Sequence, residues 1–293
     1  MQQVTVRVPA STSNLGPGFD CLGVALRIYN SVKVTGGRLP EQPHPEIVSQ
    51  AAGRFFKEAR RRPFPFSVSI AEKIPRSRGL GSSATIRVGI LHALNHLSGD
   101  PFDQITIFQL CAELEGHPDN AAPTSFGGFT VVSASRPDGA IIFQRFEVSA
   151  QLYFVLLIPD FEIKTSPARQ ILPSKISRLA AVENCANACT IAAAFAAKDY
   201  ERLRGGFVDY IHQPFRAKLI PFLPDVIASA ERAGGLGAFL SGSGSAICAI
   251  TLQQPARVAA AMKRAAQSSL SHTIITRADN RGAHVVRSQI TNH

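Results

Sequence analysis

The chain is poor in the features that mark secreted, disulfide-bonded or membrane proteins. Its 293 residues include five cysteines, odd in number and scattered, which argues against a disulfide framework. Cys185 and Cys189 lie four apart in an alanine-rich stretch, and we expect both to be buried small residues. No apolar run approaches the ~20 residues of a membrane span. The first residues, MQQVTVRVPA, alternate like a strand and lack the basic head and apolar middle of a secretory signal, so we expect a cytoplasmic protein without a membrane partner.

Acidic residues are also scarce. The chain has 21 of them against 31 basic ones, for a net charge of +10. This surplus would suit an anionic ligand. The densest basic run, KEARRR at 57–62, is expected to end a solvated helix. Because the basic residues lack interleaved aromatics and a recognisable reading motif, no nucleic-acid partner is expected.

What is present is an ordinary globular composition, with 45% hydrophobic and 18% charged residues. Period-two alternation predicts strands at 4–8 and 66–70. Helical spacing of apolar residues predicts helices, and further apolar runs predict strands. The helices are expected at 47–61, 82–98, 103–115, 175–211 (interrupted near Asp199), 224–234 and 255–268. The further strands are expected at 127–134, 140–148, 152–159, 236–240, 246–252 and 283–287, the last three completing a second sheet.

Strands and helices are therefore mixed without regular βαβ alternation, and the expected fold class is α+β. The length allows two modest domains. The stretch IPDFEIKTSP, near residue 160, carries proline-bearing loop after a buried strand and is the expected boundary, giving domains 1–160 and 161–293.

A glycine-serine stretch, PRSRGLGSSA at 75–84, separates the strand at 66–70 from the helix at 82–98. Glycine permits close approach of backbone to a ligand, and Ser82 or Ser83 could cap the helix. The unpaired N–H groups of a first helical turn and the helix dipole would form a phosphate cradle. An ordinary glycine-rich loop with a serine cap is the alternative, and this segment alone leaves the two open. There is no Gly-Lys-Ser/Thr, so it is not a Walker-type loop.

Three other segments accompany this stretch: PASTSNLGPGFDCLG (9–23), ELEGHPDNAAP (113–123) and LSGSGSA (240–246). In this order the four blocks resemble the GHMP small-molecule kinases. KTSPARQILP (164–173) and HQPFRAKLIP (212–221) are similar to the homoserine kinase branch of that family. The resemblance runs from about residue 4 to residue 287.

The resemblance implies a ribosomal S5 domain 2-like N-terminal domain that binds the nucleotide and a ferredoxin-like C-terminal domain that completes the substrate site. The implied reaction transfers the γ-phosphoryl group of ATP, with Mg²⁺, to the side-chain hydroxyl of L-homoserine. The product would be O-phospho-L-homoserine, on the route to threonine. A homodimer is also expected.

The resemblance also assigns roles along the phosphate loop. The residues expected to hold ATP are Pro75, Arg78, Gly79, Leu80, Gly81, Ser82, Ser83 and Ala84. Ser83 and Glu113 are expected to bind Mg²⁺, a hard ion that prefers oxygen ligands, with Glu115 as the competitor of Glu113.

At the acceptor end, the resemblance assigns the carboxylate of homoserine to Arg169 and Arg216, because guanidinium groups bind carboxylates through paired N–H donors. The residues expected around the amino and hydroxyl ends are Asn14, Asp20, His117 and Asn120. The candidate catalytic residues are Asn14, Asp20, Asn120 and Arg169. His117 could equally be structural, and Asp119 is not expected to be a general base.

Three positions depart from the family's pattern. Ser245 stands where proline is usual, Arg78 where serine or alanine is common, and Glu46 where an asparagine often lies near the adenine. Two alternatives therefore stay open: a GHMP kinase for another small alcohol, and a ligand-binding paralogue without catalysis.

Overall fold

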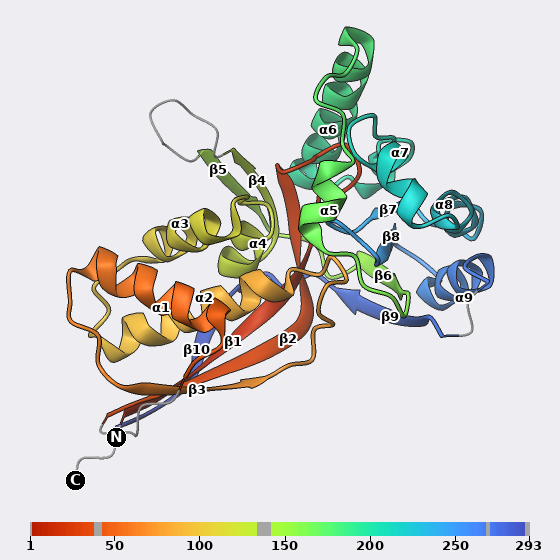
Figure 1. Ribbon diagram of the computed structural model, residues 1–293. Helices are drawn as coiled ribbons and strands as arrows, with labels where there is room; N and C mark the ends of the chain where they lie inside the picture. The colour runs from red at the N-terminus through yellow and green to blue at the C-terminus, as the bar shows by residue number, and fades with distance from the viewer. Residues whose placement is uncertain (1, 38–42, 134–141, 268–269, 291–293) are drawn as a thin grey trace.

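Two antiparallel sheets form the framework of the computed structural model, which describes residues 2–37, 43–133, 142–267 and 270–290 (Figure 1). The first sheet has the strand order β10-β1-β2-β4-β5, with β3 also paired to β2. Its strands are β1 (Gln2–Ser13), β2 (Leu22–Gly36), β3 (Phe66–Ala71), β4 (Phe129–Ser133), β5 (Ile142–Phe146) and β10 (His284–Ile290). The second sheet has the order β7-β8-β6-β9. Its strands are β6 (Tyr153–Ile158), β7 (Gly237–Leu240), β8 (Ile247–Thr251) and β9 (His272–Arg277).

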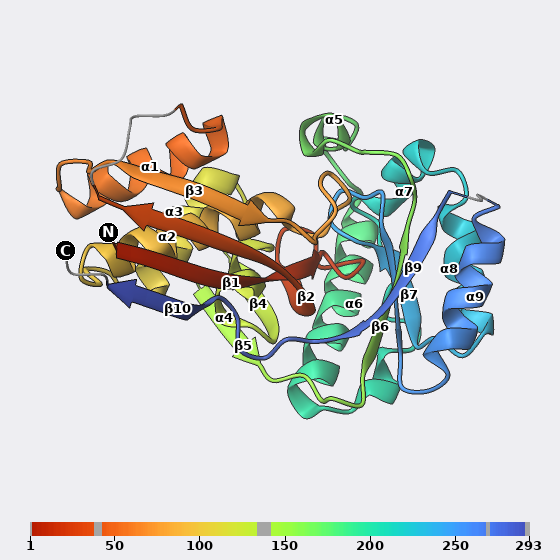
Figure 2. The same cartoon turned by 90° about the horizontal axis from the view of Figure 1, so that it is seen from below.

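Helices cover one face of the first sheet, as Figure 2 shows from below. They are α1 (Glu46–Ala59), α2 (Ser82–Leu97), α3 (Gln104–Glu115) and α4 (Ala121–Phe126). The alternation of β1 turns Val4, Val6 and Val8 toward these helices, while α1 presents Val48 and Phe55 to the same core. This packing fixes the axis of α2, whose first turn lines a cavity.

The second sheet is packed on both faces. The helices α8 (Leu223–Arg232) and α9 (Pro255–Ala265) cover one face. The long helix α6 (Arg178–Ala197) covers the other, where Phe195 joins Phe154 and Phe239 in one core. Phe195 also stacks on Phe129 of the first sheet, with ring centroids 4.2 Å apart. The remaining short elements are α5 (Thr165–Gln170), η1 (Tyr200–Leu203), α7 (Gln213–Arg216) and η2 (Ala217–Leu219).

The two-domain α+β fold is confirmed, but the expected boundary near residue 160 is wrong. β6 pairs with β8 and β9, so the second sheet begins at residue 153. The strand expected at 283–287 does not complete the second sheet either. As β10 it pairs antiparallel with β1, from Gln2 opposite Ile290 to Arg7 opposite His284. The chain thus leaves the first domain after β5 and returns to it at the end.

Most predicted elements are found, with shifted ends. The predicted elements 127–134, 140–148 and 255–268 each extend into residues outside the described part (134, 140–141 and 268). The elements that were not predicted are β2, α4, α5, α7, η2 and β9. The expected long helix at 175–211 is α6 followed by η1 and an irregular segment.

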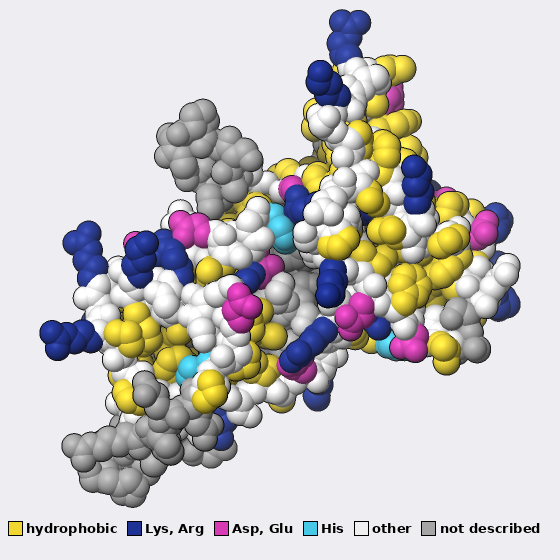
Figure 3. Space-filling model, viewed as in Figure 1, with side chains coloured by type: hydrophobic (Ala, Val, Ile, Leu, Met, Phe, Trp, Pro, Cys, Tyr) yellow, Lys and Arg dark blue, Asp and Glu magenta, His cyan; other side chains and the backbone are white. Residues whose placement is uncertain are grey.

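Helix α6 differs from expectation in two further ways. By length and composition alone it is apolar enough to cross a membrane, although core helices of soluble proteins pass the same test. Phe195 and Ile191 bury one side of it in the core. Cys185 and Cys189 are exposed rather than buried, because they lie off that side. Figure 3 shows hydrophobic side chains gathered over the second domain. Leu179 and Val182 on α6 are exposed.

Candidate active site

A cavity of about 440 Å³ lies where the two domains meet, and most of the predicted site residues line it. One end is apolar and is lined by Pro45, Ile47, Val48, Ile70 and Ile86. The other end is polar and charged, and both domains contribute to it. Its walls are Ser13, Asn14, Phe19, Asp20, Glu115, His117, Asp119, Asn120, Lys164, Thr165, Arg169, Arg216, Gly242 and Ser243. The start of α2 lies between the two ends.

The glycine-rich loop approaches its neighbours too closely for any other residue. Gly79 has a φ of +72°, and a Cβ there would lie 2.0 Å from the carbonyl oxygen of Ser241. Gly81 has a φ of +68° and forms the N-cap of α2. No side chain caps this helix, so the expected cap by Ser82 or Ser83 is wrong. The first-turn N–H groups therefore remain available beside the cavity.

The structure places only part of the predicted ATP loop in the cavity wall. Gly79, Leu80, Gly81, Ser82 and Ser83 line the cavity. Pro75, Arg78 and Ala84 are not among its lining residues, and their contact with ATP stays a prediction. The Arg78 guanidinium donates to the carbonyl of Pro159 (3.0 Å) and lies 3.6 Å from the carboxylate of Glu162, so it braces the loop against the second domain. Ala84 is fully buried in the core beneath α2.

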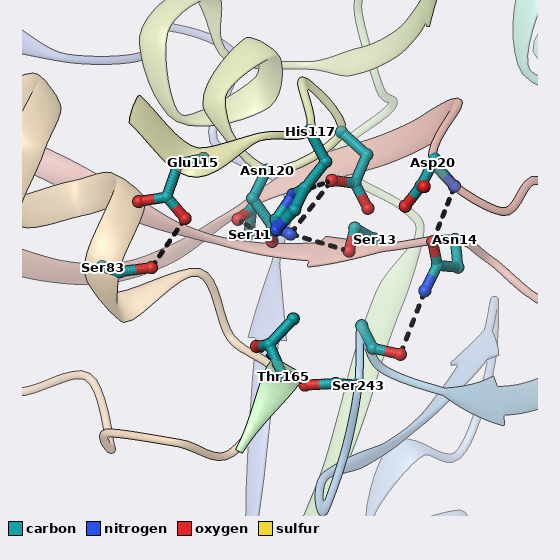
Figure 4. Close-up of polar contacts among 12 residues, drawn as sticks. Ser11, Ser13, Asn14, Asp20, Ser83, Glu115, His117, Asn120, Thr165 and Ser243 are labelled. Atoms are coloured by element: carbon teal, nitrogen blue, oxygen red, sulfur yellow. Dashed lines mark hydrogen bonds and ion pairs between the residues drawn. The ribbon is translucent and has the colours of Figure 1, made fainter. Parts of the chain in front are cut away.

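The structure places Ser83 beside Glu115, the competitor, rather than beside Glu113, and the metal ligands stay a prediction. The Ser83 hydroxyl donates to Glu115 Oε2 at 2.8 Å (Figure 4). The other oxygen of Glu115 pairs with Arg87. The Glu115 side chain is 5% exposed and lines the cavity. The Glu113 side chain is 60% exposed and pairs with Arg54 instead, at 2.7 Å. The two carboxylates leave the end of α3 in different directions, and only Glu115 reaches the start of α2.

An ion pair joins the two domains at the polar end. Arg169 on α5 donates to both oxygens of Asp20, at 2.8 and 2.5 Å. Asp20 belongs to the loop between β1 and β2, and its backbone N–H donates to Asn14 Oδ1 (3.0 Å). The Asn14 amide group donates in turn to the carbonyl of Gly242 at 3.0 Å. The polar groups of this loop are thus already ordered by protein contacts.

Arg216 is the second guanidinium of the cavity wall, and it is almost fully buried. Its Nε donates to the carbonyl of Ala168 (3.1 Å), and one terminal nitrogen donates to the carbonyl of Gly242 (3.0 Å). Burial, followed by the nearby charge of Arg169, lowers the pKa of Arg216 to about 10. The group therefore stays charged at neutral pH, held by neutral carbonyls. The ring of Phe19 lies 5.3 Å from both guanidiniums.

His117 and Asn120 lie side by side at the polar end (Figure 4), and Asp119 is hydrogen-bonded to both. His117 Nδ1 lies 2.8 Å from Asp119 Oδ1. Burial by itself lowers the pKa of His117, but the hydrogen bond and charge of Asp119 outweigh it and raise that pKa above its usual value. Burial raises the pKa of Asp119, yet His117 and the other partners leave it below its usual value. Asn120 accepts from Ser11 (2.8 Å) and donates to Ser13 (3.0 Å).

Two of the three departures from the family's pattern, Glu46 and Ser245, make local contacts of their own. Glu46 does not line the cavity although its neighbours do, and it accepts from Gln50 on the surface of α1. Ser245 donates to the carbonyl of Phe161 at 2.5 Å, so its hydroxyl ties the third glycine-rich turn to the chain after β6. The same turn supplies the Gly242 carbonyl that accepts from both Asn14 and Arg216.

Sequence reasoning gave no role to Phe19, which lines the cavity, or to His212, which lies behind Arg216. Phe19 was quoted within a motif without a role, and His212 was passed over within HQPFR. The signal that could have found Phe19 is its position directly before Asp20, on a loop expected to face anionic and cationic groups. His212 stands four residues before Arg216, a spacing that brings side chains together on one helical turn.

Comparison with known proteins agrees with this geometry. A family model described as the GHMP kinases N terminal domain matches residues 46–128, and one described as GHMP kinases C terminal matches residues 191–268. The chain therefore belongs to the GHMP kinase family.

Several relatives and solved structures to which the chain is similar are homoserine kinases. A homoserine kinase from Carboxydothermus hydrogenoformans is 36% identical over 299 residues, covering 96% of each chain. One from Deinococcus radiodurans is 40% identical over 255 residues, covering 83% of this chain and 82% of that relative. The crystal structure of homoserine kinase from Cytophaga hutchinsonii matches with a TM-score of 0.86 and 28% identity, covering 97% of each chain. A mevalonate kinase structure, at 16% identity and a TM-score of 0.70, shares the fold.

Proposed function

We propose that this protein is a homoserine kinase, which transfers the γ-phosphoryl group of ATP to the side-chain hydroxyl of L-homoserine. The observation that carries the proposal is the layout of the cavity. A glycine-lined helix start lies at its middle, and two guanidiniums and a carboxylate gather at one end. The first arrangement suits a phosphate chain, and the second suits a small zwitterion. The homoserine kinases among its relatives support the same assignment.

The charged groups of the acceptor end match those of an amino acid. Arg169 and Arg216 would bind the substrate carboxylate, and Asp20 would bind its ammonium group. The ion pair between Arg169 and Asp20 keeps both side chains in position before the substrate binds. The substrate carboxylate can then take the place of Asp20 beside Arg169, and the substrate ammonium group can take the place of Arg169 beside Asp20. The side-chain amide groups of Asn14 and Asn120 donate to protein atoms. This supports a role in fixing the residues that surround the acceptor hydroxyl.

Phosphoryl transfer demands positioning and charge neutralisation more than covalent chemistry. The N–H groups at the start of α2 would hold the phosphates, and the apolar end would enclose the base. Because a carboxylate with a depressed pKa is a weak base, Asp119 is poorly suited to take the hydroxyl proton, which supports leaving that proton to the phosphate.

The donor set of Ser83 and Glu115 fits Mg²⁺, because both are hard oxygen ligands 2.8 Å apart at the phosphate-binding helix start. When bound, the ion neutralises phosphate charge and orients the γ-phosphoryl group. In the described part of the chain no cluster of three or more His, Cys, Asp or Glu side chains could hold a metal ion alone. This agrees with an ion that keeps phosphate and water ligands.

Location and assembly stay predictions. We expect a cytoplasmic enzyme of threonine biosynthesis, a homodimer, and no nucleic-acid or membrane partner. Light scattering of the purified protein would test the dimer. RNA affinity that falls steeply with salt would contradict the expected lack of a nucleic-acid partner.

A coupled ADP-release assay with and without L-homoserine tests the proposal. We expect release to depend on L-homoserine, and amino alcohols that lack a carboxylate to be poor acceptors. Arg216→Lys should raise KM for homoserine by roughly tenfold or more and leave KM for ATP nearly unchanged, because a lysine cannot reproduce the planar guanidinium contacts. Arg202→Lys is the matched control, at a side chain 78% exposed. Binding of both substrates without ADP release would establish the non-catalytic alternative. Phosphorylation of a polyol as fast as that of homoserine would show that the enzyme acts on another small alcohol.

A further inference from the structure

The loop that carries Asn14 and Asp20 is held by side chains of the other domain. This substrate loop, residues 14–21, joins β1 to β2 of the first sheet. The carbonyl of Gly16 lies 2.8 Å from Nε2 of His212, and the carbonyl of Pro17 accepts from Asn184 Nδ2 at 2.7 Å. His212 precedes α7, and Asn184 lies on α6. Two consecutive carbonyls of the substrate loop are therefore anchored from across the domain boundary.

The surroundings of His212 define which ring nitrogen carries the proton. Nε2 faces two acceptors, the Gly16 carbonyl and, at 3.4 Å, the Asp209 carboxylate, so Nε2 must be the protonated nitrogen. Nδ1 then has a free lone pair, and a terminal nitrogen of Arg216 lies 3.3 Å from it. Asp209 also accepts from the backbone N–H groups of His212 (3.0 Å) and Gln213 (2.6 Å), which fixes the turn. The ring is fully buried, and burial lowers the pKa of His212, which keeps it neutral.

We propose that His212 is a positioning residue for the phosphoryl acceptor: one neutral imidazole fixes the substrate loop through Gly16 and the guanidinium of Arg216 through Nδ1. The inference rests on the proposed homoserine kinase function. It joins the group assigned to the substrate carboxylate to the loop whose Asp20 is assigned to the ammonium group. The distance between the two recognition sites is then set by one side chain.

Two neighbours show why an imidazole is needed here. The ring of Phe19 lies 5.3 Å from the His212 ring and 5.3 Å from the Arg216 guanidinium, so it covers the contact on one side. Asn184 anchors only the loop: its Nδ2 donates to Pro17, its Oδ1 accepts from the backbone N–H of Tyr210 (3.1 Å), and neither of these bonds involves Arg216. Of the two anchors, only His212 offers a donor to the loop and an acceptor to the guanidinium.

Two substitutions separate these two contacts. In His212→Gln, the amide nitrogen can take the place of Nε2 and keep the bond to Gly16, but nothing takes the place of Nδ1, so the terminal nitrogen of Arg216 keeps only its bond to the Gly242 carbonyl. In His212→Asn, the amide oxygen can take the place of Nδ1, but the side chain is too short to reach Gly16. Asn184→Ala is the matched variant that loosens the loop without touching Arg216.

We expect His212→Gln to raise KM for L-homoserine about tenfold and to leave KM for ATP within about twofold. We expect His212→Asn and Asn184→Ala to lower kcat about tenfold, with a smaller rise in KM for homoserine, because the acceptor is less well aligned. If all three variants change the KM values for both substrates in proportion, or if His212→Gln behaves like the wild type, the positioning role is wrong.

A second measurement does not depend on the variants folding. The ¹⁵N chemical shifts of His212 in the wild-type protein should show a protonated Nε2 and an unprotonated Nδ1, and a protonated Nδ1 would overturn the proposal. Failure of the proposed function looks different: the wild type itself would release no ADP in response to homoserine, whereas the ring's tautomer would be unaffected.

Discussion

Exchanging Glu115 for glutamine tests the assignment of the metal ligand most directly. Glu115 and Glu113 stand two residues apart at the end of α3, yet only Glu115 contacts Ser83. Glu115→Gln keeps the shape of the side chain and removes its charge. Glu113→Gln makes the same chemical change at a side chain that is 60% exposed and paired with Arg54. The two variants are therefore matched in chemistry and in position along the chain.

The magnitude follows from charge at short range. At roughly 4 Å and an effective dielectric constant near 20, one pair of unit charges is worth about 4 kcal/mol. Glu115 shares its charge with Arg87, which offsets part of this, and a divalent ion adds to it. A net loss of about 3–4 kcal/mol corresponds to roughly 10²–10³-fold in kcat/KM. Folding should lose less, about 1–2 kcal/mol, because Arg87 keeps a bond to Gln50 at 3.1 Å.

The assay is homoserine-dependent ADP release over a titration of Mg²⁺, with thermal unfolding of each variant as the folding control. We expect Glu115→Gln to need far more Mg²⁺ and to stay slow at saturation, while Glu113→Gln follows the wild type. If Glu113→Gln loses as much activity as Glu115→Gln, or if Glu115→Gln is fully active at low Mg²⁺, the assigned metal ligands are wrong.

Three further predictions concern stability. Gly79→Ala should lower the free energy of unfolding by at least about 2 kcal/mol, because its Cβ would lie 2.0 Å from a backbone oxygen. Gly53→Ala, in the middle of α1 with no atom nearby, should raise the free energy of unfolding by about 0.5–1 kcal/mol. Chemical denaturation measures both effects, and equal effects would contradict the close approach at Gly79. His117 should stabilise the protein fully below its unfolded pKa of 6.5 and lose that contribution as the pH rises through the higher pKa of the folded state, while ionised Asp119 contributes above pH 3.8. The free energy of unfolding of the wild type should therefore fall more than that of His117→Gln between about pH 6 and pH 8.5. Parallel pH curves for the two proteins would refute this. Phe195→Ala should lower the free energy of unfolding by about 3–5 kcal/mol, because the ring is fully buried between α6 and both sheets; a loss below about 1 kcal/mol would show that the core closes over the gap.

Contiguous features of the site could be predicted from the sequence. The glycine-rich loop and the helix after it form one segment, so their local chemistry already indicates a phosphate cradle. The choice between Glu113 and Glu115 could not be made in the same way. Residues two apart on a helix point about 200° away from each other, and only the packing of α3 against α2 decides which one faces inward.

The strand β2 was missed because its pattern changes along its length. Val32 and Val34 alternate with polar residues and face the helices, but the run Leu22–Leu26 is buried on both sides, where the two domains meet. A continuous apolar run carries no period-two signal. The exposure of Cys185 and Cys189 has a similar cause, since an alanine-rich helix shows no polar face from which its buried side can be deduced.

The pairings of distant segments lie beyond local reasoning. Alternation at 283–287 indicates a strand but not its partner, and the partner is β1, at the other end of the chain. The domain boundary was misplaced for the same reason, because β6 is assigned to a sheet by strands that follow it by about a hundred residues. His212 acquires its two contacts only when the domains come together.

The return of β10 to β1 has a consequence for biosynthesis. While a ribosome is still producing the second domain, the first one has β1 as an open edge, with its outward N–H and C=O groups unpaired along residues 2–7. That edge is closed only when residues 284–290 emerge. During most of its translation, the nascent chain therefore exposes a β1 edge that can pair with another polypeptide. Chaperones would matter most in this interval.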